Sequence, residues 1–472
     1  MKKYLSLLLI ILVMTACQQQ VAKPAVSETI KIGFIGPLTG DTASLGTTLR
    51  DGAEIAVEEI NAKGGVNGKK IEAIYEDGGC KAQGATLAAQ KLINNDKVVL
   101  IIGGSCSSET LAAAPIAEEA KIILISPSSS NPDITKAGDY IFRTWPSDTG
   151  QGKAIAEKMI KDGITKVGII NTNSDYNIGL AKAFTESFTT NGGQVLIHEM
   201  YEQDSKDFRT QLTKIKAKNV EALYIVPYLE GGLILKQAKE LGLTIPMYGS
   251  EVLGSKEIVN DAGGAAENVV YATAKFDDQA EPAKAFLAKY QQKYGKEPSY
   301  PSFAATAYDT VMVVTDAMKA GTESETIKNY LYNLNDYSGV AGTLTIDENG
   351  DALKEFQIMV IQNGEFIPLE KKKEGTTLPS ALTITQDETG VLLSADAIEK
   401  GKVELTIKNA AQDQIATALE GPEIDEIYNT APGKTTQVEI SLAPGNYVVY
   451  DPVGDHRSKG LEATFTVVCK TC

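Results

Sequence analysis

Apolar runs and helical patterns alternate along the chain from residue 30 onwards. Several of the runs are continuously apolar, which is typical of parallel strands that are covered on both faces. We expect strands, in two consecutive series, at residues 30–38, 70–78, 97–104 and 121–128, and then at 166–173, 194–201, 222–229 and 269–276. Strands that alternate with helices in this way predict a doubly wound α/β architecture.

The clearest helical pattern lies between the first two expected strands, over residues 46–62. Its apolar residues fall on one face at a period of 3.6: Leu49, Ala53, Ala56, Val57 and Ile60. Two glycines, at positions 64 and 65, then stop the helix.

The two series of strands resemble two similar lobes. Ligands of open α/β sheets sit beyond the carboxyl ends of the strands. Two facing lobes would therefore enclose a ligand in the cleft between them.

The pattern changes after about residue 370, where a charged and turn-rich stretch, residues 370–380, reads as a linker. Short strand-like runs with turns between them follow, at residues 381–387, 390–394, 402–409, 436–442, 446–452 and 461–468. They predict an all-β sandwich over residues 381–472, about 90 residues long.

The N-terminus has the pattern of a signal peptide over residues 1–16. Lys2 and Lys3 precede an apolar run, residues 5–13, that is too short to cross ~30 Å of hydrocarbon. Thr15 and Ala16 then precede Cys17, which resembles a bacterial lipobox, so Cys17 is expected to carry the lipid. The alternative is a plain secretory signal that contains a cysteine. The polar stretch up to residue 28 reads as a flexible tether.

Composition narrows the classes of function. The chain has 472 residues, 43 % of them hydrophobic, which fits several globular domains. Its net charge of −16 argues against a nucleic-acid partner, because phosphate binding needs clustered Lys and Arg. Of the five cysteines, the four that follow Cys17 could pair in an oxidising compartment.

Signals for catalysis are weak. The chain has two histidines, His198 and His456, and neither has a Cys or Asp partner at ligand spacing. No GxSxG, HExxH, P-loop or post-strand GxGxxG motif occurs. We therefore expect no enzyme activity, no metal and no cofactor.

Three loops at predicted strand ends are rich in small polar groups. Residues 103–110 place Ser107 and Ser108 at a helix start, and residues 126–135 supply Ser128, Ser129 and Ser130. Hydroxyls and free N–H groups suit a carboxylate ligand, although ordinary helix capping or a turn gives the same pattern. In residues 247–254, Glu251 could pair with an ammonium group, or could be a solvated surface residue.

A resemblance to a known family connects these loops. The segments IGPLTGDTASLG, DGAEIAVEEINAKGGVNGKKIE, IIGGSCSSET, ILISPSSSNPDIT, FRTWPSD, DFRTQLTKIK and YGSE resemble, in order, the leucine/isoleucine/valine-binding family of ABC-transporter substrate-binding proteins. The resemblance covers residues 29–369 and implies a type I periplasmic binding protein. Its two Rossmann-like lobes would comprise about residues 29–147 with 275–354, and 148–274 with 355–369.

The resemblance also implies the ligand contacts. Ser107, Ser128 and Ser130 would hold an α-carboxylate, and Glu251 an α-ammonium. The side-chain pocket would be lined by Tyr176, Tyr228 and Phe303, whereas Leu45 replaces the family's first-loop aromatic. Cys80 and Cys106 would form the family disulfide.

The tail resembles a cupredoxin more weakly, through GKVELTIKN, PGNYVVYDPVGDH and GLEATFTV. A blue-copper site needs two His, one Cys and usually a Met. Here His456 stands alone, Asp451 takes the Cys position and Leu461 the Met position. We expect a degenerate, metal-free module. The terminal Cys469 and Cys472 could form a local disulfide, a free dithiol or half a metal site.

Together, the N-terminal pattern and the family resemblance imply a lipid-anchored protein on the outer side of the membrane. It would capture an amino acid-like ligand for an ABC-transporter permease. The alternatives are a ligand-sensing receptor with the same fold and, less favoured, a cupredoxin-linked redox protein.

Overall fold

A computed structural model describes residues 29–369, 381–387, 390–394, 397–422, 424–452 and 462–468. The signal peptide, Cys17, the linker, His456, Leu461, Cys469 and Cys472 lie outside these residues. The chain divides after Leu369 into two compact units, here called the binding unit and the tail unit. No helix of the described residues is long and apolar enough to cross a membrane.

The first lobe of the binding unit is built on a five-stranded sheet with the order β2-β1-β3-β4-β5. All of its pairings are parallel. The strands are β1 (Ile30–Gly36), β2 (Ile71–Asp77), β3 (Leu100–Ile102), β4 (Ile123–Ser126) and β5 (Ile141–Arg143). The helices after β1 to β3 are α2 (Ala43–Ala62), α3 (Ala82–Lys91) and α4 (Ser107–Ala120).

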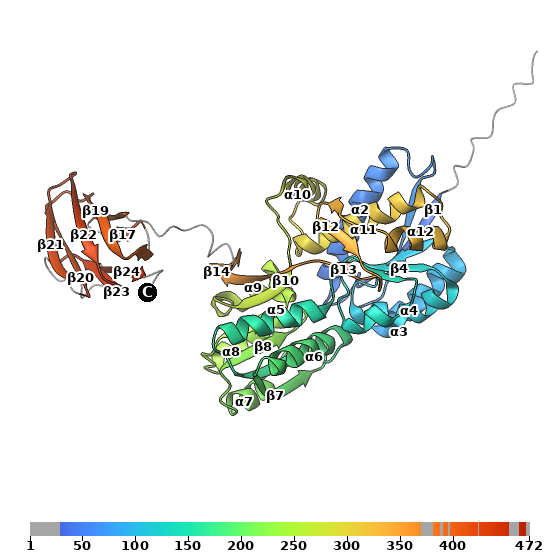
Figure 1. The fold of residues 1–472 in the computed structure, drawn as a ribbon, viewed down its shortest axis with the longest axis horizontal. Coiled ribbons are helices and arrows are strands. Elements are labelled where there is room, and N and C mark those ends of the chain that lie inside the picture. Colours follow the sequence, from blue (N-terminus) through green and yellow to red (C-terminus); the bar gives the residue numbers. More distant parts are fainter. Residues whose placement is uncertain are drawn as a thin grey trace, which may run out of the picture. The chain divides into compact units, whose positions relative to one another are not determined.

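Helices cover both faces of this sheet, as expected from its continuously apolar strands (Figure 1). Alternate residues of β3 point to opposite faces. Leu100 and Ile102 join a core that contains α2, whereas Ile101 joins a core with the alanines of α3 and α4. Two later helices, α11 (Pro301–Met318) and α12 (Ser324–Tyr332), also belong to this lobe, since α11 packs along α2. A Cβ on Gly52 would lie 2.2 Å from the Ala304 carbonyl oxygen, so glycine permits this close packing.

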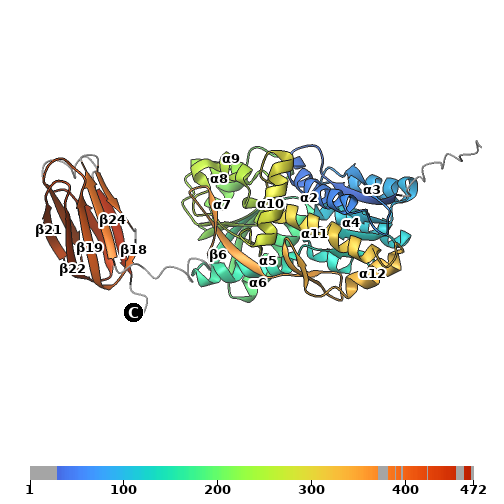
Figure 2. The same ribbon diagram turned by 90° about the horizontal axis from the view of Figure 1, so that it is seen from above.

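The second lobe is built on a seven-stranded sheet with the order β15-β14-β10-β9-β8-β6-β7. Its strands are β6 (Lys166–Thr172), β7 (Gln194–Tyr201), β8 (Ala222–Val226), β9 (Met247–Gly249), β10 (Val270–Ala274), β14 (Phe356–Gln362) and β15 (Glu365–Pro368). β6 to β10 are parallel, and β14 and β15 run antiparallel at one edge. Figure 2 shows α5 (Asp148–Lys161) and α6 (Asp175–Thr190) on one side of β6, and α7 (Arg209–Lys216), α8 (Gly231–Glu240) and α9 (Lys256–Ala262) on the other.

The chain passes between the two sheets three times. It leaves the first sheet after β5, returns after β10 through α10 (Glu281–Tyr294), and leaves again between β13 (Ala352–Leu353) and β14. A small sheet of β11 (Tyr337–Gly339), β12 (Gly342–Ile346) and β13 precedes the last passage. The predicted fold class, two α/β lobes followed by a small all-β region, is confirmed.

The described residues of the tail unit form two mixed sheets, with the orders β17-β16-β19-β22 and β18-β24-β23-β20-β21. The strands are β16 (Ala381–Asp387), β17 (Gly390–Leu393), β18 (Ala397–Glu399), β19 (Gly401–Asn409), β20 (Ile415–Gly421), β21 (Ile424–Thr430), β22 (Thr435–Leu442), β23 (Gly445–Tyr450) and β24 (Glu462–Val468). Apolar residues of both sheets, among them Leu405 and Phe465, form one core. The sequence reading missed β18, β20 and β21.

Candidate functional site

A small cleft lies where the loops after the strands of both lobes meet, as the carboxyl-end rule predicts. Its free space is about 280 Å³, of which about 20 Å³ admits the centre of a water molecule, so the lobes are nearly shut on it. The lining residues are Leu45, Ser105, Cys106, Ser107, Ser128, Tyr176, Tyr228, Glu251, Val252 and Phe303. Six of the seven residues predicted to bind a ligand are therefore brought together. A larger groove beside α5 and α6, with a free space of about 1110 Å³, has mostly exposed side chains and holds none of the seven.

Ser107 is the first residue of α4, where helix N–H groups lack intrahelical partners. Its buried hydroxyl oxygen accepts a hydrogen bond of 3.2 Å from the Asn131 backbone N–H. The hydroxyl hydrogen thus remains available to an acceptor in the cleft. The neighbouring Ser108 hydroxyl is buried with no partner. Together with the helix terminus, these groups suit an anion.

Ser128 lines the cleft, but its hydroxyl is already engaged. It donates to the Ser105 carbonyl oxygen at 2.7 Å. A ligand carboxylate would therefore meet the backbone of Ser128 and not its hydroxyl hydrogen. Ser129 is also occupied, since its hydroxyl donates to the Gly104 carbonyl oxygen at 2.9 Å.

Ser130 differs from the other predicted residues because it does not line the cleft. Its hydroxyl is buried and lacks a partner. Its carbonyl oxygen accepts a 2.8 Å hydrogen bond from the Asp148 N–H, so it lies directly beside the start of α5 in the second lobe.

Glu251 follows the short strand β9 and is 6 % exposed. It is not the solvated surface acid that its spacing alone allowed. Its Oε2 atom has no hydrogen-bond partner. Burial raises the pKa of Glu251 well above its usual value and the charge of Asp148 adds to this, while Trp145 and Tyr176 oppose it. The carboxylate is thus poised for a cationic partner.

Asp148 is a second buried acid at this site, and the sequence reading missed it. It is the first residue of α5, and neither carboxylate oxygen has a partner. Burial raises its pKa to about 7, against the opposing effects of the Ser130 hydroxyl and the Arg143 charge. A Ser-Asp pair at a helix start looks like ordinary capping, so no signal in the sequence separates it from a solvated cap.

Aromatic side chains close the cleft. The ring centroids of Tyr176 and Tyr228 are 5.6 Å apart, and both hydroxyls are buried without a partner. Phe303 packs edge-on against Trp145 at 4.5 Å. Leu45, in the first turn of α2, stands where the family resemblance implies an aromatic residue.

Cys80 and Cys106 form a disulfide that joins the loops after β2 and β3, with a sequence separation of 26. The buried Glu109 carboxylate accepts backbone N–H groups of both cysteines, each at 2.9 Å. These contacts fix the loop that carries Ser107. Burial raises the pKa of Glu109 to about 7, although the backbone N–H groups oppose this.

Metal ligands do not gather in the part of the chain that the structure describes. There, no group of three or more His, Cys, Asp and Glu side chains could hold an ion. His198 lies on the edge strand β7 and its ring contacts the Asn171 side chain.

Two α/β lobes, joined by three crossovers and lined with unpaired polar groups at their meeting edges, define a two-lobed ligand-binding protein. The chain belongs to the periplasmic binding protein family, whose model matches residues 29–365. It is a family of binding proteins and not of enzymes.

Curated relatives and solved structures agree with this membership. The chain is 34 % identical over 343 residues to a leucine-, isoleucine-, valine-, threonine- and alanine-binding protein of Pseudomonas aeruginosa. This match covers 71 % of this chain and 90 % of that protein. A branched-chain amino acid transporter substrate-binding protein of Streptococcus pneumoniae, solved with isoleucine, is 35 % identical with a TM-score of 0.66, over 72 % of this chain and 98 % of that chain. A solved leucine-binding protein of Thermotoga maritima is 33 % identical with a TM-score of 0.68, over 72 % of this chain and 97 % of that chain. The family model leaves residues 366–472 unmatched.

Proposed function

We propose that the protein binds a branched-chain amino acid between its lobes and delivers it to the permease of an ABC importer. One observation carries this proposal. One small cleft is lined by Ser107 of the first lobe, whose hydroxyl hydrogen is available to an acceptor, and by Glu251 of the second lobe, whose buried Oε2 atom has no hydrogen-bond partner. The relatives that bind leucine, isoleucine and valine support the ligand class.

An amino acid zwitterion would complete this arrangement. Its carboxylate would accept from the Ser107 hydroxyl and from the backbone N–H groups of the two serine loops. Its ammonium would face Glu251, with Asp148 behind. Burying either charge alone would cost several kcal/mol, so each charged group of the ligand would have to be paired with a polar or charged group of the site. Leu45, Val252 and Phe303 leave an apolar place for an aliphatic side chain.

Ligand binding would hold the two lobes together, because each end of the ligand contacts a different lobe. The ligand shifts the population towards the closed form by its higher affinity for that form. A permease could then recognise the closed form. A ligand-sensing receptor would use the same step, and would be distinguished by co-purification with a sensor instead of a permease.

An aromatic acid is the second candidate ligand. A solute-binding protein of Rhodopseudomonas palustris, 28 % identical with a TM-score of 0.66, was solved with 3,4-dihydroxybenzoic acid. Such a ligand has no ammonium and would leave Glu251 and Asp148 buried without a cation. The two carboxylates therefore favour an amino acid.

Isothermal titration with leucine, isoleucine, valine, threonine and 3,4-dihydroxybenzoate tests the proposal. We expect an aliphatic amino acid to bind and the benzoate not to bind. Glu251→Gln keeps the shape of the side chain but removes its charge, and should weaken amino acid binding by about 100-fold or more. Glu439→Gln, at an exposed ion pair with Lys402 in the tail unit, is the matched control and should bind as the unaltered protein does. Unchanged affinity in Glu251→Gln, or tighter binding of the benzoate, would contradict the assignment.

The two ends of the chain complete the proposal. Cys17 would carry a lipid that holds the protein on the outer side of the membrane, and mass spectrometry of the membrane fraction should find a diacylglyceryl mass on Cys17. The tail unit would be a metal-free, cupredoxin-like spacer or interaction module. Its β strands and the absence of a second copper-ligating histidine in the sequence support this.

A further inference from the structure

Asn131 is a buried amide that joins three parts of the binding unit. It is 4 % exposed and directly follows the serine loop. Its backbone N–H donates to the Ser107 hydroxyl oxygen at 3.2 Å. Its Oδ1 accepts the Asp133 N–H at 2.7 Å, which caps the short helix that follows. These contacts fix Asn131 against the candidate carboxylate site in the first lobe.

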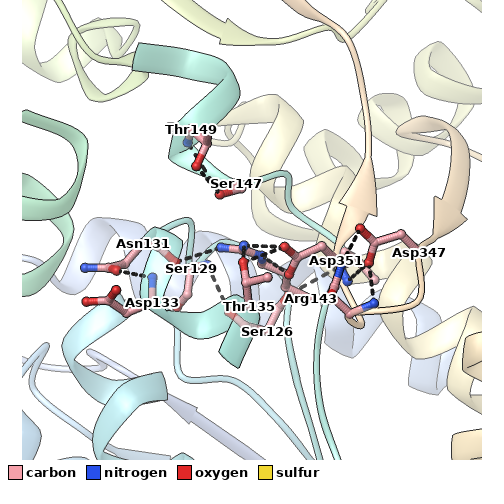
Figure 3. Close-up of polar contacts among 12 residues, drawn as sticks. Ser126, Ser129, Asn131, Asp133, Thr135, Arg143, Ser147, Thr149, Asp347 and Asp351 are labelled. Carbon is pink, nitrogen blue, oxygen red and sulfur yellow. Dashed lines mark hydrogen bonds and ion pairs between the residues drawn. The ribbon is translucent and has the colours of Figure 1, made fainter. Parts of the chain in front are cut away.

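The Asn131 carbonyl oxygen extends these contacts to the crossovers. It accepts a 2.9 Å hydrogen bond from Nη1 of Arg143, at the end of β5, where the chain leaves the first lobe. The same guanidinium, fully buried, holds Asp351 through two hydrogen bonds of 2.7 Å. Asp351 precedes β13, on the segment that leads to the third crossover. Figure 3 shows Arg143 between Asp351 and the loop of Asn131.

The Asn131 side chain also reaches across to the second lobe. Its Nδ2 donates to the Asp175 carbonyl oxygen at 2.6 Å, one residue before Tyr176 of the cleft. Helix α6 also packs closely against the Asn131 side chain at Gly179. A Cβ added to Gly179 of α6 would lie 2.6 Å from Asn131 Nδ2 and 3.2 Å from Pro132 Cδ. A glycine at 179 therefore lets α6 meet this loop.

We propose that Asn131 is a positioning residue that fastens the closed lobes, linking the ligand's carboxylate site and the crossovers to the start of α6. This inference rests on the proposed function, because it assumes that a ligand closes the lobes. Asn131 does not line the cleft, so it would act on affinity through Ser107 and through the inter-lobe hydrogen bond.

Asn131→Asp removes the donor of the inter-lobe hydrogen bond. The variant keeps an acceptor for the Asp133 N–H but replaces the donor to Asp175 with a carboxylate oxygen. Losing a buried hydrogen bond in the closed form should raise the ligand dissociation rate about tenfold. The association rate and the melting temperature of the ligand-free protein should stay close to those of the unaltered protein. The single tryptophan, Trp145, lies on the first crossover beside Phe303, so its stopped-flow fluorescence can report both rates.

Asn67→Asp is the matched control. Asn67 is exposed, and its Nδ2 also donates to a backbone carbonyl oxygen, that of Lys319, but within the first lobe. We expect its dissociation rate to stay within about twofold of that of the unaltered protein. A purely structural role of Asn131 would lower the melting temperature of the ligand-free variant and leave the dissociation rate unchanged. That result would overturn the proposal.

Gly179→Ala gives an independent test from the other lobe. The added methyl group should also speed dissociation, since it meets Asn131 only when the lobes are closed. In a background of Asn131→Ser, whose shorter side chain makes room, the same methyl group should cost less. Additive effects of the two substitutions would show that the two residues do not meet in the ligand-bound form, and would contradict the proposal.

The two proposals fail in different ways. If the unaltered protein binds no amino acid, the proposed function is wrong. If it binds, and Asn131→Asp releases the ligand at the unaltered rate, only the role of Asn131 is wrong.

Discussion

The binding unit and the tail unit differ in whether their buried polar side chains have hydrogen-bond partners. Among the described residues, every buried side-chain polar atom without a hydrogen-bond partner lies in the binding unit. Many of these atoms surround the cleft or lie directly behind it: Ser108, Ser130, Trp145, Asp148, Tyr176, Tyr228, Ser250 and Glu251. A few others, such as Asp96 and Gln211, lie elsewhere.

Buried polar side chains of the tail unit are paired within the protein. Thr417 donates to Gln386 at 2.8 Å, and the Asn409 amide donates to the Thr430 carbonyl oxygen at 2.7 Å. Native proteins satisfy nearly all such groups, so a cluster left unpaired calls for an external partner. The unpaired groups therefore support the proposed ligand site in the binding unit, whereas the described residues of the tail unit show no such cluster.

The largest expected effect is on the stability of the tail unit, which we expect to unfold in a transition separate from that of the binding unit. Leu405→Ala removes a fully buried side chain from the tail core and should destabilise that unit by about 2–5 kcal/mol. Calorimetry should then show one transition moved down and a second, raised by leucine, left in place.

Leu49→Ala provides the converse, because Leu49 is fully buried in α2 of the binding unit. It should lower only the transition that responds to ligand. If either substitution moved both transitions equally, the two units would unfold as one, and the comparison would fail.

A smaller effect concerns the dependence of stability on pH. The folded-state pKa of Asp148 is raised to about 7 by burial, whereas an unfolded aspartate titrates near 4. The folded protein therefore keeps a proton that the unfolded chain releases. Its contribution to stability is full below about pH 4 and is lost as the pH rises through 7.

Asp148→Asn removes this titration. At pH 8 the ligand-free variant should be more stable than the unaltered protein by about 1–2 kcal/mol. Its free energy of unfolding should also change less between pH 5 and pH 8. Glu251 and Glu109 have raised pKa values too, so some dependence will remain. Asp175→Asn is the control, because Asp175 also begins a helix but is exposed. Thermal unfolding at both pH values is the measurement, and equal shifts in the two variants would contradict the assignment to Asp148.

Parts of this picture could be predicted from the sequence. The long apolar strands and the helix α2 carry strong periodic signals, and the family resemblance placed Glu251. Strands such as β5 and β9, three residues each, are too short for periodicity to show. Asp148 was missed because it is buried where the start of α5 meets the first lobe beside Ser130, a contact that no local pattern records.

The engagement of the Ser128 hydroxyl was equally out of reach. Three adjacent serines look alike in the sequence, and only the fold decides that one donates to Ser105, one to Gly104 and one to neither. Sequence patterns thus indicate where polar groups gather, whereas the remaining hydrogen-bonding capacity of each group depends on its neighbours in space.

The interleaving of the lobes has a consequence for biosynthesis. The first lobe needs α11, which packs along α2 although some 240 positions separate Ala62 from Pro301. A nascent polypeptide that has emerged only as far as β10 holds a finished set of five parallel strands but lacks the helix that covers α2. The first lobe can therefore be completed only after the whole segment that builds β6 to β10 of the second lobe has been synthesised.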